Sequence, residues 1–252
     1  GIIYSIPSGG QDCSWAAACG TITLMQHLEL TCLLDDPDAL KARIRNLLAG
    51  RQRRTIPHEG LRVSAVLICI CWMDSGPTVI LTKRSPDVEH HKGEISFPGG
   101  SAEPHDKDAV GTALREAEEE IGLSADDVEV LGVLDDHLSI VGYHITPVVG
   151  WAPCPYEFRI NSESEELLML PLREVFREGA WMAERSFFKG STVNLYFLEM
   201  EGGVVWGATA RMLKHFADLL AGRSLPFIAV SESARAWVMN LIDSRGSYRN
   251  LR

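Results

Sequence analysis

Four glutamates stand within five consecutive positions near the middle of the chain, and they are Glu116, Glu118, Glu119 and Glu120. At about 100° per residue, an α-helix places Glu116, Glu119 and Glu120 on one side and turns Glu118 away. The same rotation gathers an apolar stripe, which consists of Val110, Ala113, Leu114, Ala117 and Ile121. Residues 107–121 are therefore predicted to form an amphipathic helix that buries the stripe and presents three carboxylates.

Three carboxylates on one helix face repel each other, and such like-charge pairs cost a few tenths of a kcal/mol each in an isolated helix. They also stand near the helix end where the helix dipole favours cations. A hard divalent cation would compensate both effects, and oxygen-only ligands suit Mg²⁺ or Mn²⁺, which substrate phosphates complete. The alternative is a solvated acidic face, the usual meaning of a charge run. The position of the charges at the helix end argues against it.

A Phe-Pro-Gly-Gly turn at residues 97–100 precedes this helix. Its glycines allow positive φ and a close approach of backbone to a ligand. Such a turn is a weak signal alone. It becomes a strong one here because strand, loop, helix and the terminating Gly122 form one continuous unit.

This unit resembles the Nudix box, whose pattern is GX5EX7REUXEEXGU with U an aliphatic residue. The matching positions are Arg115, Glu116, Ala117, Glu119, Glu120, Gly122 and Leu123. The gap from Gly100 to Arg115 is one residue longer than the pattern, and Lys107 stands where the first glutamate belongs. Asp106 or Asp108 is the candidate replacement for that acid.

A narrower resemblance, to the coenzyme A pyrophosphatase branch of this family, covers most of the chain from about residue 60. Residues 80–85, Gly93 and residues 97–100 are similar to the branch motif LLTX(R/T)SX3RX3GX3FPGG, and the branch shares the longer gap. Further similar stretches are residues 144–149, 163–172 and 206–213. One position departs from the branch, since Glu89 stands where its arginine is found.

The resemblance implies a metal-dependent hydrolysis of a pyrophosphate bond. Mg²⁺ or Mn²⁺ would be bound by Glu116, Glu119 and Glu120 with the Gly100 carbonyl, and would activate water for attack at phosphorus. Arg115 would orient the carboxylates through a charge-assisted pair, and Glu119 counts as catalytic as well as metal-binding. Residues expected to contact the substrate are Lys83, Arg84, Ser85, Phe97 and Gly99.

A separate general base is expected in the acidic stretch before Leu167. Glu163 is the first candidate because it matches the branch's own acid, and Glu165 and Glu166 are its alternatives. For each of these glutamates, a position in a solvated loop is an equally good interpretation. For the histidines near the motifs, a structural imidazole is favoured over a substrate contact, and these are His90, His91 and His144.

The substrate implied by the branch is a small nucleotide, coenzyme A or a derivative, cut to phosphopantetheine and adenosine 3',5'-bisphosphate. Aromatic candidates to line its thiol arm, which are more often core residues, are Trp181, Phe187, Phe188 and Trp206. Another Nudix pyrophosphatase activity, on ADP-ribose or a different nucleoside diphosphate derivative, is the first alternative. A non-catalytic Nudix-fold binding module is the second, and the retention of all the metal-site glutamates argues against it.

Strands and helices alternate irregularly along the chain, which predicts an α/β protein with a mixed sheet between helices. This matches the α/β/α sandwich that the resemblance implies. Strands are predicted at 61–72, 78–84, 94–97, 128–135, 144–151, 184–189 and 193–200, and helices at 107–121, 171–177, 208–221 and 231–243. The predicted organisation is an N-terminal extension at 1–34, a helix and linker at 35–59, and the Nudix domain at 60–245.

Charge and cysteine content limit the binding partners and the cellular compartment that we expect. A net charge of -10 argues against nonspecific nucleic-acid binding. The apolar run from Trp15 to Met25 is too short to span a bilayer. The six cysteines form no CxxC pair, so reduced thiols in the cytoplasm are expected, with Cys69 and Cys71 as buried fillers. A homodimer is left open.

Overall fold

The computed structural model describes residues 29–86, 93–139, 142–188 and 191–243. Most of the predicted extension at 1–34 lies outside the described residues. So do three residues before Gly93 that entered the sequence argument, namely Glu89, His90 and His91.

A mixed sheet of eight strands forms the centre of the fold. Its main path runs in the order β3-β2-β1-β7-β5, from Ile95–Ser96 through Gly76–Arg84, Arg62–Met73 and Tyr143–Ala152 to Glu129–Val133. Three further strands join this path. Strand β4 (Gly99–Ser101) pairs with β1, strand β8 (Ser164–Pro171) pairs with β2, and strand β6 (His137–Leu138) pairs with β7. The β1–β7 pair is parallel and the other pairs are antiparallel. This confirms the predicted mixed sheet.

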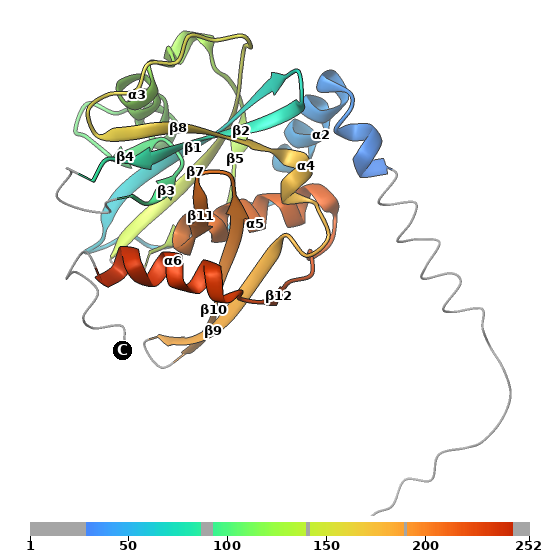
Figure 1. Cartoon of the computed structure of the whole chain (residues 1–252). Coiled ribbons are helices and arrows are strands. Elements are labelled where there is room, and N and C mark those ends of the chain that lie inside the picture. The colour runs from blue at the N-terminus through green and yellow to red at the C-terminus, as the bar shows by residue number, and fades with distance from the viewer. Residues whose placement is uncertain (1–28, 87–92, 140–141, 189–190, 244–252) are drawn as a thin grey trace, which may run out of the picture.

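Side chains of β1 alternate between two cores, as the period of a strand requires. Leu67 and Cys69 pack with α3 (Ala109–Ile121) on one face. Ile68 and Ile70 pack on the other face with α2 (Pro37–Ala49) and α5 (Gly207–Ala221). Figure 1 shows α3 and α5 on opposite sides of β1. The α/β/α sandwich is therefore confirmed, and its faces are set by burial on both sides of one apolar strand.

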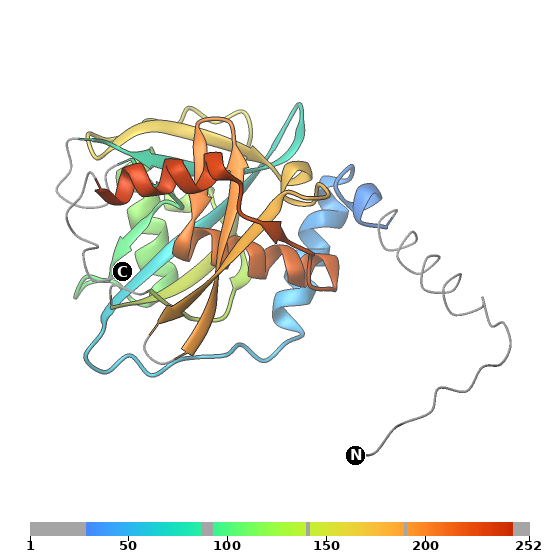
Figure 2. The same cartoon turned by 60° about the horizontal axis from the view of Figure 1, so that its bottom comes forward.

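A second sheet, not anticipated from the sequence, covers α5 on the side away from the central sheet. Its order is β11-β10-β9-β12, with bounds Gly203–Trp206, Ser191–Met200, Trp181–Phe188 and Ile228–Ala229. Trp181 and Leu198 join the core around α5, while Met182 and Phe197 face α6 (Glu232–Asp243). Figure 2 shows α6 lying across the strands of this sheet.

The N-terminal helix α2 lies within the predicted helix and linker at 35–59. Asp36 caps it by accepting hydrogen bonds from the backbone N–H groups of Asp38 and Ala39, both at 3.0 Å. Its apolar stripe, through Leu40 and Ile44, is buried in the core shared with β1.

Three segments differ from their predicted form. Residues 97–100 do not merely turn, because Gly99–Ser101 form strand β4 against β1. The acidic stretch from 164 onward is strand β8 rather than a solvated loop. Its alternate residues Leu168 and Leu170 have their side chains buried in the core. Helix α3 begins two residues later than predicted, because the Asp108 side chain caps it by accepting from the Gly111 N–H at 2.9 Å.

The remaining elements are a short helix α4 (Leu172–Val175), as predicted, and a single turn η1 (Ala125–Asp127). No helix in the described part of the chain has the length and apolar character needed to cross a bilayer.

Candidate functional site

Strand β4 brings the glycine pair against the acidic helix. A Cβ atom on Gly100 would lie 2.5 Å from the carboxyl carbon of Glu116. A Cβ atom on Gly99, whose φ is +157°, would lie 2.5 Å from the Ala65 carbonyl oxygen of β1. Only glycine allows both approaches, so the close packing of β4 between β1 and α3 explains the two glycines.

Arg115 holds the polar side of α3 together. Its Nε lies 2.9 Å from Asp106 Oδ1 and its Nη2 lies 3.1 Å from Asp106 Oδ2, which makes a two-pronged ion pair. The same guanidinium contacts Glu116 at 3.0 Å and Glu119 at 3.1 Å, and donates to the Ser101 carbonyl at 3.0 Å. The structure thus places Arg115 where it orients two of the three predicted carboxylates.

Asp106 takes the place of the missing first acid of the box. Its carboxylate is 5% exposed and also accepts from the Glu103 N–H and the Thr112 hydroxyl. These bonds, the one from Arg115 first, hold the pKa of Asp106 well below its usual range. Of the two candidates, Asp106 therefore pairs with the arginine, while Asp108 caps the helix.

Glu120 is a buried carboxyl whose negative charge is only partly balanced by its neighbours. Its side chain is 8% exposed, and Oε2 accepts a 3.2 Å hydrogen bond from the Gly99 N–H. Burial raises its pKa to about 7, and the Gly99 N–H and Arg84, at 3.7 Å, only partly oppose this. Burial also raises the pKa of Glu116, against the opposing effect of Arg115.

Arg84, at the end of β2, connects Glu120 to Glu163. Its Nη2 lies 3.1 Å from Glu163 Oε2, and the Ser85 N–H donates to the Glu163 carbonyl at 2.8 Å. Glu165 pairs instead with Lys83 at 3.5 Å. Among the candidate bases, Glu163 is thus the one that the fold joins to the glutamate helix through an arginine.

Several predicted site residues lie elsewhere. The Phe97 side chain is only 1% exposed and packs in the core that contains Ile68 and Ile70 of β1. The prediction that this side chain contacts the substrate is therefore wrong. Trp181 is likewise a core residue, whereas Phe187 is 75% exposed. His144 is buried with Nε2 3.0 Å from Asp136, which agrees with the structural reading.

The fit of these residues to a metal can be judged from their chemistry. Among the residues that the structure describes, no three carboxylate, imidazole or thiol groups converge closely enough to hold a metal ion. Glu119 is 57% exposed and pairs with Arg115 at 3.1 Å, so turning toward the other two glutamates would break one exposed ion pair at little cost. Glu116 is partly buried and Glu120 is buried. Both are oxygen donors with raised pKa values, and a hard cation would balance their negative charges. The donor set therefore fits Mg²⁺ or Mn²⁺ once Glu119 turns.

Two features of this site escaped the sequence interpretation. The pairing of Arg84 with two acids was not foreseen, since Arg84 was expected only to contact substrate. The strand character of 164–171 was also missed, although the apolar run from Leu167 to Leu170 next to an acidic pair was a usable signal for a half-buried strand.

Comparison with known proteins identifies the family of this chain. The NUDIX domain model matches residues 61–194, which is more than half of the chain. The Nudix hydrolase NudL of Yersinia pestis (strain Pestoides F) is 38% identical over 158 residues, covering 62% of this chain and 79% of NudL. NudL of Yersinia pseudotuberculosis serotype O:1b (strain IP 31758) matches to the same extent.

Among solved structures, a NUDIX hydrolase from Nitrosomonas europaea aligns over 71% of this chain and 80% of its own, at 15% identity and a TM-score of 0.43. The domain match and the NudL relatives both include the segment with Arg115 and its glutamates. The chain belongs to the Nudix family.

Proposed function

We propose that this Nudix pyrophosphatase hydrolyses the pyrophosphate bond of coenzyme A or a derivative, giving phosphopantetheine and adenosine 3',5'-bisphosphate. The proposal rests on the ion pairs that Arg84 makes with Glu120 and Glu163. Arg84 belongs to the stretch that resembles the coenzyme A branch, whereas Glu120 belongs to the general Nudix box. Their contact joins the substrate motif to the catalytic helix.

The cation would be held by Glu116, Glu119 and Glu120, with the Gly100 carbonyl as a further oxygen donor. Bound Mg²⁺ or Mn²⁺ supplies charge neutralisation of the pyrophosphate and a lowered pKa of water. Arg115, held by Asp106, orients Glu116, while Glu119 would leave its ion pair with Arg115 to reach the cation.

Glu163 is the proposed general base. Its carboxylate is half exposed, so water reaches it, and Arg84 orients it at 3.1 Å. Arg84 also offers a guanidinium to a substrate phosphate, for which its planar donor fork is well suited. Lys83, which pairs with Glu165 at 3.5 Å, is the second phosphate-contacting cation of this strand.

The described cysteines, Cys32, Cys69, Cys71 and Cys154, are all free thiols. This supports our proposal that the enzyme works in a reducing compartment, the cytoplasm.

A substrate panel tests the assignment. The protein is incubated with Mg²⁺ or Mn²⁺ and coenzyme A, ADP-ribose or NADH, and the products are identified by mass spectrometry. We expect coenzyme A to be the preferred substrate. Preference for ADP-ribose would move the enzyme to another Nudix branch, in line with the departure at Glu89, and turnover of none would favour a non-catalytic Nudix module.

Three matched variants test the acidic face. Glu119→Gln and Glu120→Gln each remove one charge of the proposed metal site and are expected to lower kcat/KM by about a thousandfold, or about 4 kcal/mol. Glu118→Gln makes the same chemical change on the exposed side of α3 and should leave kcat/KM unchanged. Equal activity in all three variants would show that the metal binds elsewhere.

A further inference from the structure

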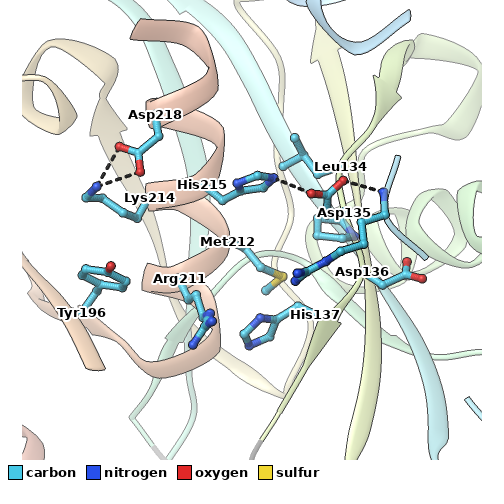
Figure 3. A pocket seen from close by; sticks show the side chains of 12 residues that line it. Leu134, Asp135, Asp136, His137, Tyr196, Arg211, Met212, Lys214, His215 and Asp218 are labelled. Atoms are coloured by element: carbon cyan, nitrogen blue, oxygen red, sulfur yellow. Dashed lines mark hydrogen bonds and ion pairs between the residues drawn. The ribbon is translucent and has the colours of Figure 1, made fainter. Parts of the chain in front are cut away.

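A cavity of about 210 Å³ lies on the face of the central sheet opposite α3. Its walls come from α5, from residues 134–137 after β5, from Pro147 on β7, and from the linker that precedes β1. Figure 3 shows the side chains of α5 facing residues 134–137 across this space. None of the residues assigned above to the Nudix site lines it.

The acidic side chains of this cavity are already matched by partners. Asp135 pairs with Arg51, accepts from the Arg54 N–H at 2.9 Å, and lies 3.3 Å from His215 Nε2. The other two acids are likewise engaged. Asp136 contacts Arg53 and the Ile56 N–H, and Asp218 contacts Lys214 and the Leu225 N–H.

Among the described residues, three basic side chains of the cavity have no protein partner, and the two arginines among them are exposed to solvent. Within the described part of the chain, the Arg54 guanidinium, the His137 imidazole and the Arg211 guanidinium make no hydrogen bond or ion pair. Figure 3 shows Arg211 and His137 next to each other.

The three aspartates that line the cavity are each paired with a cation, Asp135 with Arg51, Asp136 with Arg53 and Asp218 with Lys214. The positive charges of Arg54 and Arg211 are therefore not balanced by these acids. Burial, and then the charges of Arg211 and His215, lower the pKa of His137 to about 4. A neutral His137 retains one ring N–H to donate.

We propose that this cavity binds the phosphate group of a small molecule through Arg211, Arg54 and His137. Guanidinium groups recognise phosphate by paired, charge-assisted hydrogen bonds, and a neutral imidazole adds one donor. Tyr196 and Met212 form a less polar wall that suits the organic part of the ligand. Nothing in the Nudix site requires these residues, so the cavity is a second anion site.

Calorimetric titration of the full chain with inorganic phosphate tests this site. The buffer contains EDTA and a constant ionic strength set with chloride, so that the metal face and general screening do not contribute. We expect saturable binding to the unaltered protein. In Arg211→Gln the affinity should fall about tenfold or more, because one charge-assisted contact is lost.

Arg43→Gln is the matched control, since Arg43 is an exposed arginine of α2 outside the cavity. Its affinity should stay within about twofold of the unaltered protein, which is the range of a nonspecific charge effect. Phosphate should also shift the NMR signals of the His137 ring and raise its pKa. Absence of saturable binding, or equal weakening in both variants, would overturn the proposal.

Enzyme kinetics distinguish two possible sources of the bound phosphate group. If the site receives the 3'-phosphate of the substrate itself, Arg211→Gln raises KM for coenzyme A but not for dephospho-coenzyme A. If it receives a separate phosphate compound, both KM values stay unchanged while phosphate binding is lost. Because the titration needs neither metal nor turnover, its result is independent of the proposed coenzyme A activity, which only this kinetic comparison assumes.

Discussion

The buried carboxyl of Glu120 makes a quantitative prediction for the metal-free protein. Its pKa rises from an ordinary 4.5 to about 7, chiefly through burial. At about 1.4 kcal/mol per pH unit, this difference corresponds to at most about 3.5 kcal/mol of lost stability. We therefore expect Glu120→Gln to stabilise the metal-free protein at alkaline pH.

The sign follows from proton release. Below pH 4.5 the carboxyl is protonated in both the folded and the unfolded protein, so it contributes no pH dependence. Between pH 4.5 and about 7 the unfolded chain releases the proton while the folded protein retains it, so stability falls as pH rises through this window. The variant lacks this loss. The amide keeps the acceptor for the Gly99 N–H. The pKa of about 7 already includes the opposing attraction of Arg84 at 3.7 Å. Part of the loss occurs below pH 5, so about 2 kcal/mol of it is expected between pH 5 and pH 8.

The assay is urea unfolding in EDTA at pH 5 and pH 8, with Glu118→Gln as the exposed control. The free energy of unfolding of Glu120→Gln relative to the unaltered protein should increase by about 2 kcal/mol between the two pH values. The control should show no such increase. An identical effect of Glu120→Gln at both pH values would refute the reasoning that burial leaves this carboxyl uncompensated. Added Mg²⁺ should reverse the order, because only the unaltered site gains the stabilisation of a bound ligand.

Further predictions concern the neighbours of the acidic helix and the core thiols. Asp106→Asn should lower kcat/KM about 10- to 100-fold by loosening the arginine that orients the carboxylates, whereas Lys107→Gln should leave it unchanged; equal values would remove Asp106 from the site. Gly100→Ala places a Cβ 2.5 Å from the Glu116 carboxyl carbon, which is the end of a side chain and can shift, so activity should fall while the urea midpoint changes little; normal activity would show that the position of this carboxyl does not matter. Burial raises the pKa of Cys71 to about 12, so this thiol should resist iodoacetamide at pH 8 until the protein is unfolded, as peptide mass analysis can check; rapid labelling of the folded protein would show that it is accessible.

The acidic helix could be predicted because its information is local. The 3.6-residue period places Glu116 with Glu120 and turns Glu118 outward whatever the rest of the fold does. Capping by Asp36 and the strand alternation of β1 are local in the same way. For these elements the sequence was sufficient, since neighbours in the chain decide the outcome.

The partners of the site residues needed the tertiary structure. Whether Asp106 or Asp108 replaces the first acid of the box depends on where the loop before α3 passes over Arg115. Phe97 looked like part of a ligand turn, but the pairing of β4 with β1 directs it into the core. Linear spacing does not contain these contacts.

The sequence by itself determined the family resemblance, the mixed α/β fold and the helix that carries the glutamates, because periodicity and motif spacing act over short stretches. Only the tertiary structure decided that Arg84 joins Glu120 to Glu163, two acids 43 residues apart in the chain. It also created the basic cavity, whose Arg54, His137 and Arg211 come from a linker, a short strand and a helix. Such convergence arises from strand pairing and packing across the sheet, which bring distant segments together in ways that no local pattern encodes.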